Sequence, residues 1–165
     1  MTHACCPGSY DPMTSGHLDV IERAARQFDQ VTVLVTHNPN KQGMFNVEER
    51  MDLIRQCTQH LDNVQVDSWS KLLVDYTSAQ GISCLVKGLR SAADYEYEAP
   101  MAQMNRRMTG IETLFVEADP KYGHVSSTLM KEVVRYGGSV EGLVPEPVLH
   151  ALPVSYTHLR AHETL

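Results

Sequence analysis

Apolar runs of strand length recur along the chain, and amphipathic segments with helical period separate them. The apolar runs lie at residues 4–6, 31–35, 64–67, 82–87 and 113–117. The segments with helical period lie at residues 18–28, 46–59, 72–80, 96–107, 127–136 and 145–152. Continuous β-branched runs are typical of parallel strands covered on both faces, and repeated strand–helix units require right-handed crossovers. The pattern therefore predicts an α/β fold: a Rossmann-like, doubly wound, five-stranded parallel sheet with helices on both faces.

Proline and glycine residues indicate where several of these elements end. Pro7 and Gly8 are expected to end the first strand, and Gly88 is expected to end the fourth. Pro100 lies inside the segment 96–107, so it either kinks this helix or marks its true first turn. Ligands of open parallel sheets bind beyond the carboxyl ends of the strands. The glycine-bearing segments after the first, second and fourth strands are therefore expected to converge at that edge.

The length of the chain, 165 residues, suits a single domain, which we place at residues 1–152. Residues 153–165 show no amphipathic continuation, and they resemble the translated adapter read-through that sometimes ends sequences assembled from raw DNA reads. A natural flexible tail would give the same pattern. We therefore expect residues 153–165 to be either a disordered tail or a non-native read-through, and we place no site residue there.

The chain has a formal net charge of −6, from 14 basic and 20 acidic residues. This balance argues against a general nucleic-acid-binding protein, which needs net or clustered positive charge. Small polyanions can still bind where a few cations and backbone donors converge. Lys41, Lys87 and Arg90 lie in apolar or glycine-rich surroundings, so they are the candidates for such an anion site.

No apolar stretch is long enough to span a bilayer, and the first residues lack the basic and hydrophobic regions of a signal peptide. We therefore expect a cytoplasmic protein that binds no membrane. The cysteines agree with this expectation, because Cys5 and Cys6 are adjacent, Cys57 and Cys84 stand alone, and no CxxC pair occurs. They predict neither a disulfide framework nor a zinc site. Buried free thiols are expected, with Cys57 as the one candidate for exposure.

The segment from Gly8 to His17, Gly-Ser-Tyr-Asp-Pro-Met-Thr-Ser-Gly-His, places a turn between the first apolar run and the first amphipathic helix. His17 falls in the first helical turn, where free backbone N–H groups and the positive end of the helix dipole attract anions. Ser9 and Thr14 can donate to phosphate oxygens, and His17 can hydrogen-bond or carry charge near neutral pH. Gly8 and Gly16 permit a close backbone approach or a positive φ. A lone histidine is more often an ordinary residue, but this segment favours a phosphate site.

The residues from Thr14 to His17 have the form of the T/SxGH signature, and here the chain resembles the nucleotidyltransferases that join a nucleotide to a phosphate acceptor and release pyrophosphate. That short match would be weak alone. Further blocks resemble the phosphopantetheine adenylyltransferase family: Lys-Gly-Leu-Arg at 87–90, Asp-Tyr-Glu-Tyr-Glu at 94–98, Met-Ala-Gln-Met-Asn at 101–105, and Val-Ser-Ser-Thr at 125–128 with Lys-Glu-Val at 131–133. The likeness runs in order, with similar spacing, from about Ala4 to Leu152.

The resemblance implies that the phosphate of 4′-phosphopantetheine attacks the α-phosphorus of ATP directly, giving dephospho-coenzyme A and pyrophosphate without a covalent enzyme intermediate. Both reactants are anions, so catalysis depends on holding them in line and on neutralising charge. No acidic pattern such as DxDxDG occurs, so a dedicated protein metal site is not expected, and Mg²⁺ is expected to arrive with ATP, held mainly by phosphate oxygens and water. The resemblance further implies a homo-oligomer, typically a hexamer, and feedback binding of coenzyme A at the active site.

The resemblance also assigns roles to the residues at matching positions. The catalytic candidates are His17, Lys41 and Arg90, with His17 as the group that stabilises the transition state. The residues expected to contact the acceptor are Ser9, Lys41, Leu73 and Lys87. The residues expected to contact ATP are Ser9, Tyr10, His17, Gly88, Leu89, Arg90, Glu98, Tyr122, Gly123, His124, Val125, Ser126, Ser127 and Thr128. Three of these depart from the family pattern: Tyr10 replaces a common phenylalanine, His124 takes a bulky position, and Thr128 ends a run of serines.

Most of these residues also have an ordinary explanation that needs no ligand. The alternatives are a solvated loop lysine for Lys41, an ion pair or helix cap for Arg90, apolar core for Leu73, a solvated helix start for Glu98, and a plain N-cap for Ser126 and Ser127. Met101, Met104 and Met108 recur at helical spacing, which favours core or subunit packing over ligand contact. Asp11 and Pro12 either shape the turn alone or make a polar contact.

Two other functions remain open from the sequence. One is a sibling enzyme that uses the same chemistry on another phosphate acceptor, such as nicotinate mononucleotide or glycerol phosphate. The blocks at 87–90 and 94–98 favour the pantetheine enzyme over this sibling. The other is a non-catalytic nucleotide-binding module. The retained histidine and lysines disfavour it, because a binder does not need cations on both sides of a reacting phosphate.

Overall fold

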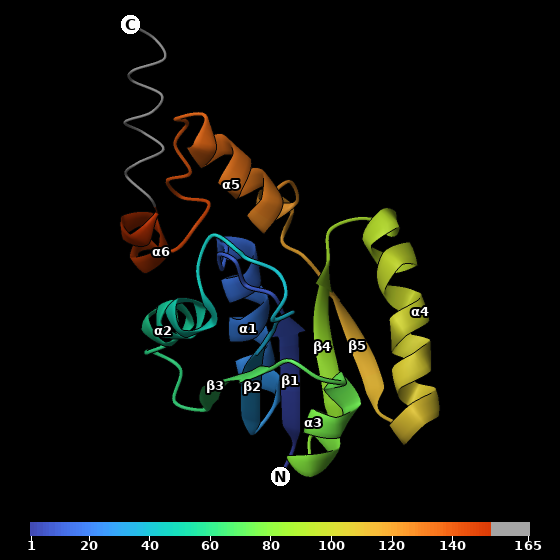
Figure 1. The fold of residues 1–165 in the computed structure, drawn as a ribbon. Coiled ribbons are helices and arrows are strands. Elements are labelled where there is room, and N and C mark those ends of the chain that lie inside the picture. Colours follow the sequence, from blue (N-terminus) through green and yellow to red (C-terminus); the bar gives the residue numbers. More distant parts are fainter. Residues whose placement is uncertain (153–165) are drawn as a thin grey trace, which may run out of the picture.

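A computed structural model of the chain describes residues 1–152 (Figure 1). The strands are β1 (His3–Gly8), β2 (Gln30–Thr36), β3 (Val64–Trp69), β4 (Cys84–Leu89) and β5 (Glu112–Glu117). The helices are α1 (Ser15–Gln27), α2 (Val47–Cys57), α3 (Leu73–Ala79), α4 (Ala92–Thr109), α5 (Ser127–Arg135) and α6 (Glu146–Ala151), with a short 3₁₀ helix at Pro120–Tyr122. The tail expected at residues 153–165 lies outside the described residues.

The strands form one parallel sheet in the order β3-β2-β1-β4-β5. Two hydrophobic clusters cover its faces, and successive residues of β1 alternate between them. Cys6 belongs to the cluster formed with α1, α2, α5 and α6, whereas Cys5 belongs to the cluster formed with α3. Helix α4 contacts α3, β4 and β5, and it stands at the β5 edge of the sheet in Figure 1. The predicted five-stranded parallel α/β fold is therefore confirmed.

The sheet opens between β1 and β4 toward its carboxyl end. Only two residue pairs join these strands, Ala4 with Cys84 and Cys5 with Leu85. By contrast, the pairing of β1 with β2 continues to Gly8, and the pairing of β4 with β5 continues to Leu89. The two halves of the sheet therefore separate where the strand order reverses, which is the place where open α/β sheets bind ligands. In Figure 1, α5 and the loop between β2 and α2 lie at this end of the sheet.

Two expected strand ends are wrong. β1 continues through Pro7 and Gly8. Proline has no backbone N–H group, but the pairing of β1 with β4 ends before Pro7, so β4 requires no hydrogen bond from this residue. β4 likewise continues through Gly88 to Leu89. A Cβ atom on Gly88 would lie 2.8 Å from Cγ2 of Val20 in α1, so this glycine allows helix and strand to pack closely rather than ending the strand.

The fourth helix begins earlier than its apolar pattern indicates. Ser91 caps it by accepting the N–H of Asp94, so that Pro100 lies inside the helix and not in its first turn. The methionines expected to be core or subunit packing are not core, since Met101 and Met104 are more than half exposed. The other strand and helix boundaries agree to within three residues, and Asn46 caps α2 in a capping box with Glu49 as its spacing indicates.

Candidate active site

A cavity of about 390 Å³ lies in the opening between β1 and β4. Its walls come from the carboxyl ends of both strands, the first turns of α1 and α5, and residues on α4. Two helix N-termini therefore meet at one cavity, and each of them favours negative charge. Most of the predicted site residues line it, namely Ser9, Tyr10, His17, Lys87, Gly88, Arg90, Glu98, Tyr122, Val125, Ser126 and Ser127.

His17 is oriented by a capping box at the start of α1. The backbone N–H of Thr14 donates to Nδ1 of His17 at 3.0 Å, and the Thr14 hydroxyl accepts the backbone N–H of His17 at 3.3 Å. Because Nδ1 accepts a hydrogen bond, the neutral ring carries its proton on Nε2. Burial, and then the charges of Arg90 and Lys87, lower the pKa of His17 to about 4. Of the two roles expected for His17, the structure supports a neutral hydrogen-bond donor near neutral pH.

Tyr10 packs against this histidine and closes the end of β1. Its ring meets the His17 ring edge-on, with 5.1 Å between centroids. Its buried hydroxyl donates to the carbonyl oxygen of Cys6 at 2.9 Å, just beyond the last pair between β1 and β4. Tyr10 itself has a positive φ, 47°, whereas Gly8 and Gly16 do not. Gly8 serves close approach, since a Cβ atom there would lie 3.1 Å from the Tyr10 ring.

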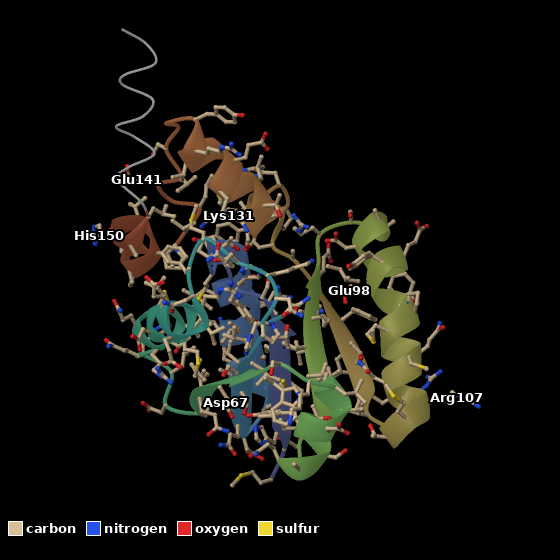
Figure 2. The ribbon with its side chains drawn as sticks, in the orientation of Figure 1. Asp67, Glu98, Arg107, Lys131, Glu141 and His150 are labelled. Carbon is tan, nitrogen blue, oxygen red and sulfur yellow. The ribbon has the colours of Figure 1, made fainter. Side chains whose placement is uncertain are left out.

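Two cations from the β4 end lie in the cavity wall, and each is paired with a carboxylate of α4. Nζ of Lys87 lies 2.9 Å from Oε2 of Glu98, which points from α4 toward β4 in Figure 2. The Arg90 guanidinium binds Asp94 through Nε at 3.2 Å, and its Nη1 donates to the Val125 carbonyl at 3.3 Å. Each of these carboxylates thus forms an ion pair with a basic side chain, and no group of three or more metal-binding side chains occurs within residues 1–152.

Lys41 lies in a second cavity, of about 570 Å³, on the loop between β2 and α2. Ser9 lines both cavities, so the two meet at the turn after β1. Lys41 is exposed, and none of the ion pairs between described residues involves it. Lys131 of α5 lines this second cavity as well.

The start of α5 is tied to the turn after β1. Ser126 caps the helix by accepting the N–H of Leu129, and the Ser127 hydroxyl donates to the Pro12 carbonyl at 2.6 Å. Ser126 is therefore an N-cap, which is the explanation of this residue that needs no ligand, and it also lines the first cavity. Several predicted residues lie outside both cavities, namely Leu73, Leu89, Gly123, His124 and Thr128. Leu73 packs against the core cluster that contains α3, which agrees with its alternative explanation as an apolar core residue.

The structure adds residues that the sequence analysis left without a role. Asp94 holds both the backbone N–H and the guanidinium of Arg90, and its spacing of four residues from Arg90 was the signal for this pair. Tyr97 also lines the first cavity, and so does Thr14, whose hydroxyl was already a candidate donor to phosphate oxygens. All four cysteines are buried free thiols, including Cys57. Across residues 1–152, no helix combines the length and apolarity of a membrane span.

Comparison with known proteins agrees with this geometry. A family model described as cytidylyltransferase-like matches residues 5–133. A phosphopantetheine adenylyltransferase of Corynebacterium efficiens is 67% identical over 155 residues, which are 93% of this chain and 98% of the relative. The enzymes of the same name from Corynebacterium glutamicum and Corynebacterium diphtheriae are 64% and 61% identical, over 94% and 92% of this chain and 98% and 96% of theirs. The chain therefore belongs to the cytidylyltransferase-like family and, within it, to the phosphopantetheine adenylyltransferases.

Proposed function

We propose that the protein transfers the adenylyl group of ATP to 4′-phosphopantetheine, giving dephospho-coenzyme A and pyrophosphate. The observation that carries the proposal is the meeting of His17, Lys87 and Arg90 in one cavity of a chain from this family. An acceptor phosphate oxygen forms a bond to the α-phosphorus, and the bond from that phosphorus to the bridging oxygen of pyrophosphate breaks. No side chain has to act as a nucleophile, so the enzyme works by positioning and by charge stabilisation.

His17 stabilises the charge that builds on the α-phosphate. Its Nε2–H is the free donor of the ring, because Nδ1 is occupied by the Thr14 N–H. A neutral donor held by a capping box needs no reorganisation when the phosphorus becomes five-coordinate. In this proposal, Lys87 and Lys41 hold the acceptor phosphate, while Arg90 and the start of α5 at Ser126 hold the ATP phosphates.

Mg²⁺ accompanies the nucleotide in this proposal. The carboxylates that line the first cavity, Asp94 and Glu98, are already paired with Arg90 and Lys87. The residues present therefore suit an ion that is held by phosphate oxygens and water. When bound, Mg²⁺ neutralises phosphate charge. Feedback binding of coenzyme A at the same cavity and a cytoplasmic location are further parts of the proposal.

We also propose that the protein is a homo-oligomer, with a hexamer as the expected state. Helix α4 exposes a row of large apolar side chains, with Tyr97 83% exposed, Met101 57% and Met104 51%, and Leu114 of β5 is 45% exposed. Exposed apolar groups gathered on neighbouring elements are typical of an interface. Light scattering after size-exclusion chromatography measures the state, and Met101→Glu is expected to lower the mass. A monomeric wild-type protein would contradict the proposal.

The activity is tested by pyrophosphate release from ATP and Mg²⁺ with 4′-phosphopantetheine. The parallel reactions contain ATP with nicotinate mononucleotide, and CTP with glycerol phosphate. Release with 4′-phosphopantetheine alone is the expected result, and His17→Ala is the matched control for catalysis by this site. Release only with another acceptor would assign the protein to a sibling reaction. If the folded protein releases no pyrophosphate in any of these reactions, a non-catalytic nucleotide-binding module would be favoured.

A further inference from the structure

Asp11 is a buried carboxylate outside the first cavity that contacts several polar groups. It lies in the turn after β1, its side chain is 7% exposed, and it lines the second cavity but not the first. The sequence left open whether it shapes the turn alone or makes a polar contact. The structure shows that Asp11 makes polar contacts, with residues more than 30 positions later in the chain.

Both oxygens of the Asp11 carboxylate bind the loop that carries Lys41. Oδ2 accepts the backbone N–H of Met44 and Oδ1 accepts that of Phe45, each at 2.9 Å. These are charge-assisted hydrogen bonds, which are about twice as strong as neutral ones. Cations complete the set, since Nε of Arg50 lies 3.5 Å from Oδ1 and Nζ of Lys131 lies 3.4 Å from Oδ2. Figure 2 shows Lys131 on the side of α5 that faces the sheet.

Arg50 extends this contact to the other side of the loop. Its Nε donates to the Phe45 carbonyl at 2.8 Å, and its Nη1 lies 3.4 Å from the Ser9 carbonyl. Gly43 lets the loop pass this closely, because a Cβ atom there would overlap both the Asp11 carboxylate and the Arg50 guanidinium. The turn after β1, the loop and α2 are thus fixed to one another through one buried carboxylate.

Lys41 depends on this anchor for its position. It lies three residues before Met44, and three residues of chain span at most about 10 Å. At the start of the loop, the backbone N–H of His37 donates to the carbonyl oxygen of Trp69 at 3.2 Å. Between His37 and Gly43, the hydrogen bonds of the described residues join only Asn38, Asn40 and Lys41 to one another, so none of them reaches the phosphate turn. The attachment of the loop to the phosphate turn is therefore made by Asp11 and its partners, immediately after Lys41 in the sequence.

We propose that Asp11 is a positioning residue for the acceptor phosphate: its buried carboxylate fixes the loop from residue 37 to residue 46 against the phosphate turn and so places Lys41. This inference rests on the proposed adenylyl transfer to 4′-phosphopantetheine. Asp11 itself does not touch the reacting atoms. Its removal acts on the acceptor through Lys41 and leaves ATP binding by the first cavity in place.

The test is a double-mutant cycle of Asp11→Asn with Lys41→Ala. The amide keeps the shape of the side chain, but it loses the negative charge and one acceptor for the loop N–H groups. We expect the KM for 4′-phosphopantetheine to rise about tenfold, which lies within the range of interaction energies measured between residues of one network. The KM for ATP is expected to change less than about twofold. In the Lys41→Ala background, Asp11→Asn is expected to add almost nothing. Asp52→Asn, an exposed carboxylate on α2, is the matched control and is expected to match the wild type.

Two outcomes would overturn the inference. One is an equal rise of both KM values, and the other is an Asp11→Asn effect that persists in full without the Lys41 side chain. If Asp11→Asn does not fold, Gly43→Ala replaces it, because the added Cβ pushes the loop from Asp11 without removing a charge. An additive cycle in an active wild-type protein rejects the role of Asp11, whereas a wild-type protein that is silent with 4′-phosphopantetheine rejects the proposed function.

A second readout does not depend on activity. Lys41 is the one trypsin site between residues 37 and 46, so cleavage after it reports how firmly the loop is held. We expect trypsin to cut after Lys41 faster in folded Asp11→Asn than in the wild type, with Asp52→Asn unchanged. Equal cleavage rates in all three proteins would show that Asp11 does not anchor the loop, whatever the substrate.

Discussion

Replacing His17 by alanine removes two separate contributions that the structure assigns to one ring. The Nδ1 atom caps α1 by accepting the Thr14 N–H, and the Nε2–H is the free donor toward the cavity. Loss of the cap is expected to lower the free energy of unfolding by about 1 kcal/mol. Loss of one preorganised donor to a developing oxyanion lowers kcat by about 10² to 10³-fold, or about 2.7 to 4 kcal/mol. The KM for ATP is expected to change little, because other groups hold the nucleotide.

The assay is steady-state pyrophosphate release at saturating 4′-phosphopantetheine, with thermal unfolding measured on the same samples. His17→Gln is the informative companion, because glutamine at this position of a capping box can still cap the helix and still donates a hydrogen bond. It is expected to retain wild-type stability and a kcat between those of the wild type and His17→Ala. A rise of the KM for ATP as large as the fall of kcat would refute the assignment to the transition state.

The pH dependence tests the protonation state of the same ring. Burial and the charges of Arg90 and Lys87 lower the pKa of His17 to about 4, so the ring stays neutral from neutral pH down to about pH 5. The kcat/KM profiles of the wild type and His17→Gln are therefore expected to run parallel above pH 5. In the unfolded chain His17 binds a proton near pH 6.5, so its contribution to stability falls as the pH falls from 6.5 to 4. A break near pH 6.5 present only in the wild type would contradict a neutral His17.

Three further predictions follow from particular contacts. Tyr10→Phe removes the donor to the buried Cys6 carbonyl and is expected to lower the free energy of unfolding by about 1 to 3 kcal/mol in urea denaturation; an unchanged midpoint and slope would show that the carbonyl needs no partner. Lys87→Ala is expected to raise the KM for 4′-phosphopantetheine about 10 to 100-fold, as loss of a charge-assisted hydrogen bond does, with exposed Lys71→Ala as control. Unchanged acceptor KM and kcat would remove Lys87 from the site. Burial raises the pKa of Cys6 to about 12 and that of Cys57 to about 11, so Ellman's reagent is expected to react with thiols only after denaturation. Rapid reaction of the native protein would contradict this for one of Cys5, Cys6, Cys57 and Cys84.

Local signals were sufficient for much of the fold. Apolar runs and helical periods identify each strand and α-helix of the fold. A strand covered on both faces of the sheet is apolar throughout, and a helix packed on the sheet is apolar on one side, so both leave a pattern in the sequence. The segment that ends at His17 likewise places this residue in a helical first turn, as the structure has it. The same sequence patterns misplace the ends of strands and helices where contacts with other parts of the fold determine those ends. Gly88 packs against Val20 instead of ending β4, and α4 begins at Ala92 under its Ser91 cap.

What the sequence determined by itself is the order of elements, the residue types at the phosphate turn and the resemblance to a family of adenylyltransferases. Only the tertiary structure decided how these residues work together. The opening between β1 and β4 depends on strand register, and the pKa of His17 depends on burial and on charges carried by β4. Asp11 meets Met44 across 33 residues, and Ser127 meets Pro12 across 115. Contacts at such separations leave no periodic signal, because they arise only when crossovers bring distant segments to one end of the sheet.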